Sequence, residues 1–342
     1  MAIIQKNNIP FIVAEISANH GGKLEVAIET VRAAKRAGAD AIKLQTYTAD
    51  TLTIKSDASD FLISQGTIWD GGYLYDLYEE AHTPWEWHAE LFKVAAEEGM
   101  ICFSTPFDVT AVDFLESLGN PIYKIASFEI TDIPLIEYAA SKQKPMIIST
   151  GIAEYEDITR AINACREVGN DDVTLLKCTS SYPARIEDMN IKMIGELRDE
   201  FGVRSGLSDH SEGFLAAVVA TALGAVMIEK HFILDKAIGG PDASFSMDEE
   251  AFKNMVKNVR EAKKALGKID FTLDEKSLKN REFAKSIYVV KNIEKGQVLT
   301  KDNIKVIRPG FGLHPKYYKE IIGKRVNKAL NRGDRLELKN ID

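Results

Sequence analysis

Two histidines near the end of separate apolar segments are the first residues of this chain that suggest chemistry. The segments are SGLSDH, which carries His210, and VMIEKHF, which carries His231. If the two segments are neighbouring strands, the imidazoles could hold one divalent cation, with water and substrate in the remaining positions. Such a site would suit Mn²⁺ or Mg²⁺, with Co²⁺ as a further choice, better than a closed structural zinc site. Two ordinary hydrogen-bonded histidines are the competing interpretation.

Lys43 and Lys124 also lie within apolar runs, where a charge without a partner is costly. Two lysines that point into one chamber would favour an anionic substrate with phosphate or carboxylate groups. A Schiff-base lysine and a lysine that reaches the surface are the alternatives. Small hydroxyl donors at the ends of other segments would suit phosphate oxygens: Ser127, Ser149, Ser180 and Ser208.

Carboxylates lie at or near the ends of two further apolar segments, FIVAEIS and IYKIASFE. Glu15 and Glu129 could each move a proton, bind sugar hydroxyls, or pair with one of the lysines. The turn GGPDASFS at residues 239–246 would present Asp242 beside them.

The apolar segments alternate with amphipathic stretches along the first three quarters of the chain. Strand, helix and strand in regular alternation predict a parallel sheet, and eight repeats favour closure into a TIM (β/α)8 barrel. The polar residues would then gather at the carboxyl end of the barrel. An open doubly wound sheet is the alternative, but Gly21-Gly22 after the first strand is not the GxGxxG turn typical of that fold. We predict strands near residues 11–17, 41–47, 101–107, 122–127, 146–150, 173–181, 204–210 and 225–233.

The chain of 342 residues is longer than a barrel of about 250 residues needs. We predict a catalytic barrel over residues 1–268, a linker over 269–282 and a small β-rich domain over 283–342. Thr51–His82 is aromatic, acidic and too long for an ordinary connection, so we expect it to cover the chamber with a short helix.

Composition and charge exclude several classes of protein. A net charge of −8 without a basic block disfavours nucleic acid as a partner. No segment reaches the roughly 18 apolar residues of a membrane span, and residues 1–11 lack the pattern of a signal peptide. Three cysteines are too few for a disulfide framework. We therefore expect a cytoplasmic protein with no membrane partner.

Motifs occur in a fixed order along nearly the whole chain: AEISANHGG, AIKLQTY, FSTPFD, YKIASFEI, ISTG, LKCTSSYP, GLSDHS, IEKHFILD, GGPDASFS and SIYVVKNIEKGQVLTKDNIKVIRPGFG. Together they resemble the sialic acid synthase family, the phosphoenolpyruvate-dependent nonulosonic acid synthases that condense phosphoenolpyruvate with an amino sugar. The last motif resembles the antifreeze-like (SAF) β-clip domain that ends this family. The resemblance implies a TIM barrel followed by a SAF domain, small-molecule substrates, and catalysis without a Schiff base.

The resemblance also implies a role for each candidate residue. It makes His210 and His231 the metal ligands. It matches Arg308, in IRPG, with an arginine that reaches the partner subunit's active site, which implies a domain-swapped homodimer. The implied phosphoenolpyruvate contacts are Lys43, Thr105, Lys124, Ser127, Ser149, Ser180 and Ser208. The residues implied to face the sugar or the reacting centre are Glu15, Gln45, Glu129, Tyr182 and Asp242.

Two departures from the N-acetylneuraminate branch point to another branch of the family. Asp242 is followed by Ala243-Ser244-Phe245-Ser246, and Ser180-Ser181 stands where that branch often has Asn-Ile. With the aromatic stretch Thr67–Trp87, these features resemble the pseudaminic acid synthase branch. Its acceptor is the more apolar sugar 2,4-diacetamido-2,4,6-trideoxy-beta-L-altropyranose. The alternatives are an N-acetylneuraminate or legionaminic acid synthase, a lysine-dependent aldolase, and a non-enzymatic carbohydrate-binding protein.

Overall fold

The computed structural model describes residues 9–64, 66 and 68–342. Residues 1–8, in the segment where we expect no signal peptide, and Thr67, in the predicted aromatic stretch, lie outside the described residues. The chain divides into two compact units, Met1–Gly267 and Lys268–Asp342. Among the described residues, no helix has both the length and the apolar character that crossing a bilayer requires.

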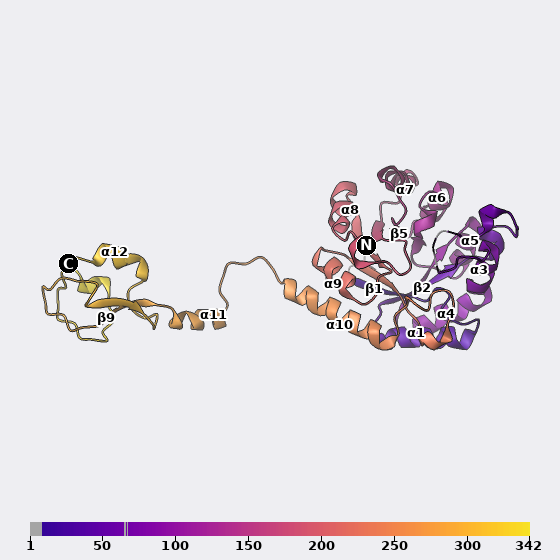
Figure 1. The fold of residues 1–342 in the computed structure, drawn as a ribbon. Helices are drawn as coiled ribbons and strands as arrows, with labels where there is room; N and C mark the ends of the chain where they lie inside the picture. Colours follow the sequence, from indigo (N-terminus) through magenta and orange to yellow (C-terminus); the bar gives the residue numbers. More distant parts are fainter. Residues whose placement is uncertain (1–8, 65, 67) are drawn as a thin grey trace. The chain divides into compact units, whose positions relative to one another are not determined.

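The first unit is a barrel with helices around it (Figure 1). Its eight parallel strands form a closed ring and follow one another around it in sequence order. This confirms the predicted TIM barrel. Each strand ends earlier than predicted because the residues at its predicted end belong to the connection that follows. Strand β1 closes the ring between β2 and β8, which places Glu15 beside Lys43 on one side and beside His231 on the other. The strands are β1 Phe11–Glu15, β2 Ala41–Thr46, β3 Ile101–Pro106, β4 Tyr123–Ile125, β5 Met146–Ser149, β6 Val173–Cys178, β7 Arg204–Asp209 and β8 Met227–His231.

Helices cover the outside of the strands because each has one apolar face to bury. In α10, for example, Asp248 caps the first turn and the buried face carries Phe252 and Val259, which belong to the cluster shared with α1 and α9. The covering helices are α1 Leu24–Ala37, α4 Trp85–Glu97, α5 Val109–Ser117, α6 Ile133–Ala140, α7 Tyr155–Glu167, α8 Met193–Phe201, α9 Leu215–Ala222 and α10 Glu249–Leu266. Short 3₁₀ turns follow three strands: η2 Ser127–Glu129, η3 Ile186–Asp188 and η4 Lys236–Ile238.

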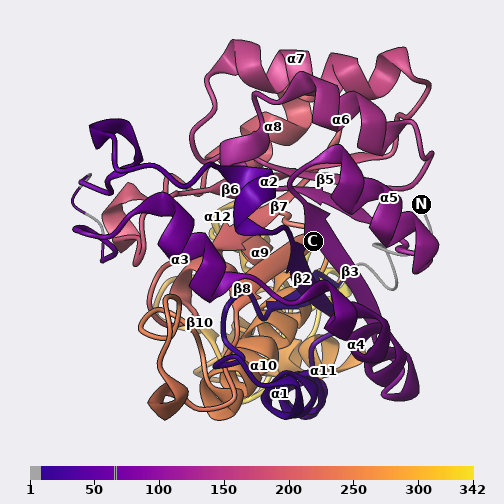
Figure 2. The same cartoon turned by 90° about the vertical axis from the view of Figure 1, so that its right-hand side faces the viewer.

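An inserted segment separates β2 from α4, where sequence reasoning expected a covering loop. It contains α2 Ala49–Leu52, the 3₁₀ turn η1 Ser59–Phe61 and α3 Leu74–Ala81. A capping box at Thr48 and Thr51 starts α2, which packs against α3 (Figure 2). The described part of the insertion is thus built on two short helices.

The second unit has its own small apolar core, formed by Ile287, Val289, Ile304 and their neighbours. Strands β9 Ser286–Val289 and β10 Ile304–Ile307 pair antiparallel. Two further segments of the predicted β-rich domain have strand-like composition, RVNKAL at residues 325–330 and RLEL at residues 335–338. They form isolated bridges, because turns at Gly323 and Gly333, with φ of 91° and 97°, reverse the chain around them. The remaining elements are α11 Glu275–Asn280, η5 Arg281–Phe283, η6 Pro315–Tyr317, α12 Tyr318–Ile321 and η7 Leu338–Asn340. The stretch predicted as a linker, 269–282, thus includes α11 and most of η5.

Candidate active site

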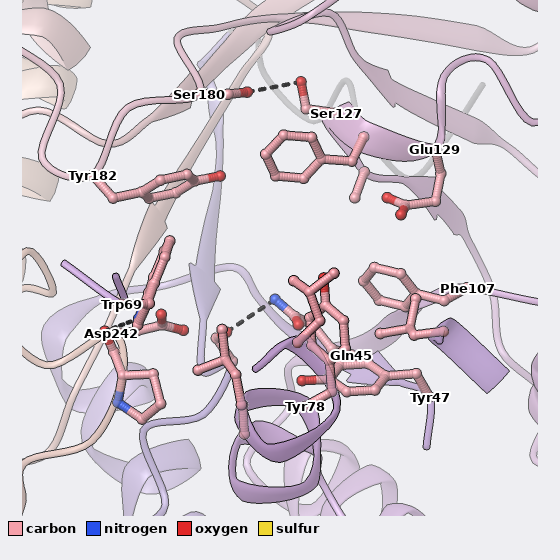
Figure 3. A pocket seen from close by; sticks show the side chains of 18 of the residues that line it. Gln45, Tyr47, Trp69, Tyr78, Phe107, Ser127, Glu129, Ser180, Tyr182 and Asp242 are labelled. Atoms are coloured by element: carbon pink, nitrogen blue, oxygen red, sulfur yellow. Dashed lines mark hydrogen bonds between the residues drawn. The ribbon is translucent and has the colours of Figure 1, made fainter. Parts of the chain in front are cut away.

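A cavity of about 580 Å³ lies where the barrel strands end (Figure 3). Its lining residues stand at, or just after, the carboxyl ends of β1, β2, β3, β4, β6 and β8, and the insertion supplies the rest. This is the end of a TIM barrel at which active sites are built. The polar lining residues are Ser17, Gln45, Tyr47, Tyr78, Ser127, Glu129, Ser180, Tyr182, His231 and Asp242.

A buried ion cluster connects β1, β2 and β8. The Nζ of Lys43 lies 2.7 Å from Glu15 Oε2 and 3.5 Å from Glu229 Oε1. The same ammonium donates to Thr105 Oγ1 at 3.3 Å. Burial opposes the charge of Lys43, but the two carboxylates outweigh it and hold the pKa of Lys43 above its ordinary value. Lys43 therefore stays cationic at the floor of the site.

Lys124, on β4, is a second buried cation. Its Nζ donates to Ser149 Oγ at 2.6 Å and to the Ile125 carbonyl at 3.0 Å. Burial, with repulsion from Lys43 acting in the same direction, lowers the pKa of Lys124. An incoming anion would restore the balance of charge, so the two lysines suit a phosphate or carboxylate ligand.

Two of the predicted serines meet above Gly151. Ser180 Oγ donates to Ser127 Oγ at 3.0 Å, which joins the loops after β4 and β6. A Cβ at residue 151 would stand 2.2 Å from Ser180 Oγ and 2.5 Å from Ser127 Oγ, so only glycine leaves room for both hydroxyls. This close approach builds a small pocket of hydroxyl donors next to Lys124.

Gln45 and Glu15 form one hydrogen-bonded unit. The amide Nε2 of Gln45 donates to Glu15 Oε1 at 3.0 Å and to Ser17 Oγ at 2.9 Å. Burial, together with the nearby carboxylate of Glu229, raises the pKa of Glu15. Ser208, on β7, donates to Glu229 Oε1 at 3.2 Å. The ion cluster therefore spans four neighbouring strands of the ring: β2, β1, β8 and β7.

The two histidines stand side by side at the ends of β7 and β8, with ring centroids 5.3 Å apart. His210 Nδ1 lies 3.1 Å from the Thr179 carbonyl, so a proton on Nδ1 leaves the lone pair on Nε2. The Nδ1 of His231 is buried without a hydrogen-bond partner and lies 3.9 Å from Asp242 Oδ2. Burial, followed by repulsion from His210, lowers the pKa of His231 well below its ordinary value.

These features fit a divalent metal. A neutral imidazole with an unpartnered nitrogen is a metal donor, and Asp242 supplies an anionic oxygen nearby. Within the described ranges, no group of three or more His, Cys, Asp or Glu residues is placed to enclose a metal. The donor set therefore suits a cation that completes its coordination with water and substrate oxygens.

Glu129 points into the cavity from the loop after β4, opposite the hydroxyl of Tyr182 (Figure 3). Its Oε2 is buried and has no hydrogen-bond partner. Burial, only partly offset by Lys124, raises the pKa of Glu129 to about 7. A carboxyl group of this kind can take up or release a proton near neutral pH.

Aromatic side chains close the cavity on two sides. Tyr47 meets Tyr78 and Phe107 edge to face, with ring centroids 5.9 and 5.0 Å apart. On the other side Trp69 packs against Tyr182 at 5.5 Å and donates from Nε1 to the Pro241 carbonyl at 3.2 Å. The insertion and the turn after β8 are thus joined over the site. The cavity residues that the insertion supplies are Leu52, Ile63, Trp69, Leu74, Leu77, Tyr78 and Ala81.

The structure gathers the predicted site residues of the first unit around this cavity and the cluster beneath it. Arg308 belongs to the second unit, where it follows β10 and is exposed, and its part in the site stays a prediction. Sequence reasoning did not commit to Glu229 or Gly151. Glu229 is a charged residue within the apolar strand VMIEKHF, and that position could have identified it. The glycine just after the polar end of β5 could have identified the second.

Comparison with known proteins gives one consistent family. The model of the NeuB family matches residues 30–271, and the model of the SAF domain matches residues 284–341. Pseudaminic acid synthase of Campylobacter jejuni is 52% identical over 96% of this chain and 95% of its own length. The enzyme of the same name from Helicobacter pylori is 51% identical over 97% and 98%.

More distant proteins match over most of this chain as well. N,N'-diacetyllegionaminic acid synthase of Legionella pneumophila is 38% identical over 97% of this chain and 94% of its own length. Among solved structures, N-acetylneuraminic acid synthetase of Leptospira borgpetersenii, in complex with citrate, matches with a TM-score of 0.71 and 30% identity, over 81% of this chain and 92% of that one.

Proposed function

Because the chain belongs to the NeuB family and ends in a SAF domain, we propose that it catalyses the pseudaminic acid synthase reaction. Phosphoenolpyruvate, water and 2,4-diacetamido-2,4,6-trideoxy-beta-L-altropyranose would give pseudaminic acid and phosphate. One structural observation carries the proposal: two buried lysines and a set of serine hydroxyls lie beside a histidine pair, beneath an apolar wall.

Phosphoenolpyruvate binds in the cationic part of the site. Lys43 and Lys124 neutralise its charge, and the hydroxyls of Ser127, Ser149 and Ser180 donate to its oxygens. With the anion bound beside them both lysines act as protonated donors, so the reaction needs no Schiff base. The binding site fixes C3 of phosphoenolpyruvate toward the sugar, which converts a bimolecular collision into a local reaction.

The open-chain sugar extends from the histidines into the aromatic half of the cavity. A divalent cation held by His210 and His231, with Mn²⁺ or Mg²⁺ as our choice, supplies Lewis acidity at the aldehyde oxygen when bound. Gln45 and Asp242 orient the sugar through its hydroxyl and acetamido groups. C3 of phosphoenolpyruvate then bonds to the aldehyde carbon, and positive charge develops at C2.

Glu129 completes the reaction in this proposal. It accepts a proton from the water that adds to C2, and its pKa of about 7 suits that task. Glu15 is less free to act, since Lys43 and Gln45 occupy its oxygens. The bond between C2 and the bridging oxygen then breaks, phosphate leaves with the proton of the C2 hydroxyl, and the ketone forms. The proton held by Glu129 passes to the former aldehyde oxygen, which becomes a hydroxyl group.

The proposal extends to the assembly and the location of the protein. A homodimer in which Arg308 reaches the partner subunit's cavity would add a cation at the open side of the site. A cytoplasmic location fits the substrate phosphoenolpyruvate and the three cysteines, which are all free.

The apolar wall favours this acceptor over N-acetylmannosamine. N-acetylmannosamine has a hydroxymethyl group where the proposed acceptor has a methyl group, and it lacks the second acetamido group. Placing that hydroxyl against Leu77 or Phe107 would leave it without a partner, which costs about 1–3 kcal/mol.

The test is phosphate release by the purified protein with phosphoenolpyruvate, Mn²⁺ and one sugar at a time. The sugars are the proposed acceptor, N-acetylmannosamine and the legionaminic acid precursor. We expect kcat/KM to be at least about tenfold higher with the proposed acceptor. Preference for either other sugar would move the chain to another branch of the family, and no release with any sugar would contradict the reaction class.

A further inference from the structure

A second ion pair lies directly behind the histidine pair. Lys230 Nζ is 2.9 Å from Asp209 Oδ2, and the side chains are 1% and 0% exposed. The same ammonium donates to the Ser211 carbonyl. Asp209 Oδ1 in turn accepts from the backbone N–H and the hydroxyl of Ser211, at 2.9 and 2.6 Å. The two contacts of Lys230 join the end of β8 to the end of β7, and the bonds from Ser211 hold the Asp209 carboxylate in place.

The pair faces away from the cavity. Side chains alternate along a strand, so Asp209 points to the same side as Leu207, and Lys230 to the same side as Ile228. Leu207 and Ile228 belong to the apolar cluster that includes residues of α9 and α10, outside the barrel. Asp209 and Lys230 therefore lie between strands and helices, where they cannot touch substrate.

The same alternation turns the neighbouring residues inward. Asp209 and Lys230 are register partners, and each directly precedes one of the histidines, His210 or His231. An ion pair between them fixes the two strand ends relative to each other. It thereby fixes the distance between the imidazoles, whose centroids are 5.3 Å apart.

A buried ion pair is a poor way to stabilise a fold, because removing two charges from water costs several kcal/mol per ion. Two apolar residues would hold β7 against β8 at least as well. The charges add a defined geometry. The 2.9 Å contact between Lys230 Nζ and Asp209 Oδ2, with the further hydrogen bonds around it, permits one arrangement of the two strand ends. We propose that Asp209 and Lys230 are positioning residues that set the spacing of His210 and His231 for one divalent cation. This inference rests on the metal site included in the proposed function.

The experiment measures Mn²⁺ binding to the full-length protein without substrates, by calorimetry or electron paramagnetic resonance. The test variant is Asp209→Asn with Lys230→Met, which removes both charges together and keeps similar volumes. The single change Lys230→Met leaves a buried carboxylate alone and risks misfolding, so it is only a supplement. The matched control is Ser205→Ala, which removes a buried hydrogen bond of 2.7 Å to the Ile194 carbonyl at the other end of β7.

We expect the double variant to fold, to bind phosphoenolpyruvate within about twofold of wild type, and to bind Mn²⁺ at least about tenfold more weakly. Ser205→Ala should lower the thermal midpoint and leave Mn²⁺ affinity unchanged. Equal Mn²⁺ affinity in the double variant and wild type would overturn the inference while the proposed function stands. A parallel loss in Ser205→Ala would also overturn it, since a general loss of stability would then explain the effect. No Mn²⁺ binding by wild type would overturn both the metal site and the inference.

Discussion

Replacing Gly151 by alanine tests the serine pocket at its tightest point. The added Cβ would stand 2.2 Å from Ser180 Oγ, 2.5 Å from Ser127 Oγ and 3.0 Å from Cys178 Sγ. Contacts below 3.0 Å require an atom to shift, and because a serine Oγ is the free end of a flexible side chain, we expect both hydroxyls to rotate away from the positions in which they would donate to the substrate. Since each hydrogen bond to a charged group is worth about 1.5–3 kcal/mol, losing both weakens phosphoenolpyruvate binding by at least about 3 kcal/mol.

This loss corresponds to a rise of roughly a hundredfold in the KM for phosphoenolpyruvate. The assay is steady-state phosphate release at saturating sugar, with the thermal midpoint measured alongside. Gly195→Ala is the control, because it adds the same methyl group on α8, where the nearest atom is 3.9 Å away. A Gly151→Ala enzyme with a KM within about threefold of wild type would refute the assignment of Ser127 and Ser180 to the substrate phosphate.

Four further changes test other parts of the site. Lys124→Met should lower kcat/KM by at least about a hundredfold while the far-ultraviolet circular dichroism stays that of wild type; normal turnover would remove Lys124 from the anion site. Glu129→Gln should be as stable as wild type near pH 4 and more stable, by up to about 3 kcal/mol, at pH 8, because ionising a carboxyl whose pKa is raised from 4.5 to about 7 costs folding energy. The rise of wild-type kcat/KM through pH 7 should vanish in the same variant, and a retained rise would exclude Glu129 as the base. A chelator should stop turnover and added Mn²⁺ should restore it; full activity in excess chelator would exclude a metal role for His210. Mixing inactive Arg308→Ala and His210→Ala proteins should restore part of the activity if Arg308 acts in the partner subunit, and no recovery after verified subunit exchange would place Arg308 in its own chain's site.

The barrel could be predicted from the sequence because parallel strands buried on both faces must be apolar throughout. A polar residue at the end of such a strand, such as Lys43 or His231, is conspicuous against that background. The segment FIVAE shows the pattern in its simplest form: all five residues are buried, and the glutamate at its end lies in the ion cluster. Polar residues within buried apolar strands therefore indicated the candidate site residues in the sequence.

Other features depended on distances that no sequence pattern gives. The sequence shows Glu229 only as a polar residue in an apolar strand. The closed barrel places its Oε1 3.5 Å from the Nζ of Lys43, and that contact makes it part of the ion cluster. The role of Gly151 depends on the loops after β4 and β6, which bring Ser127 and Ser180 so close that a Cβ at residue 151 would meet both hydroxyls. The carboxyl-terminal pieces RVNKAL and RLEL resemble strands in composition, but tight glycine turns leave too little length for a ladder. Their local propensity was overridden by the connections between them.

The fate of the bridging oxygen of phosphoenolpyruvate tests the central claim most directly. The substrate is labelled with oxygen-18 between C2 and phosphorus and incubated with the protein, Mn²⁺ and the diacetamido sugar, and both products are analysed by mass spectrometry. The account predicts that the label leaves entirely with phosphate and that the keto oxygen of the new sugar acid comes from water. Label retained in the sugar acid, or the absence of any condensation product, would contradict it.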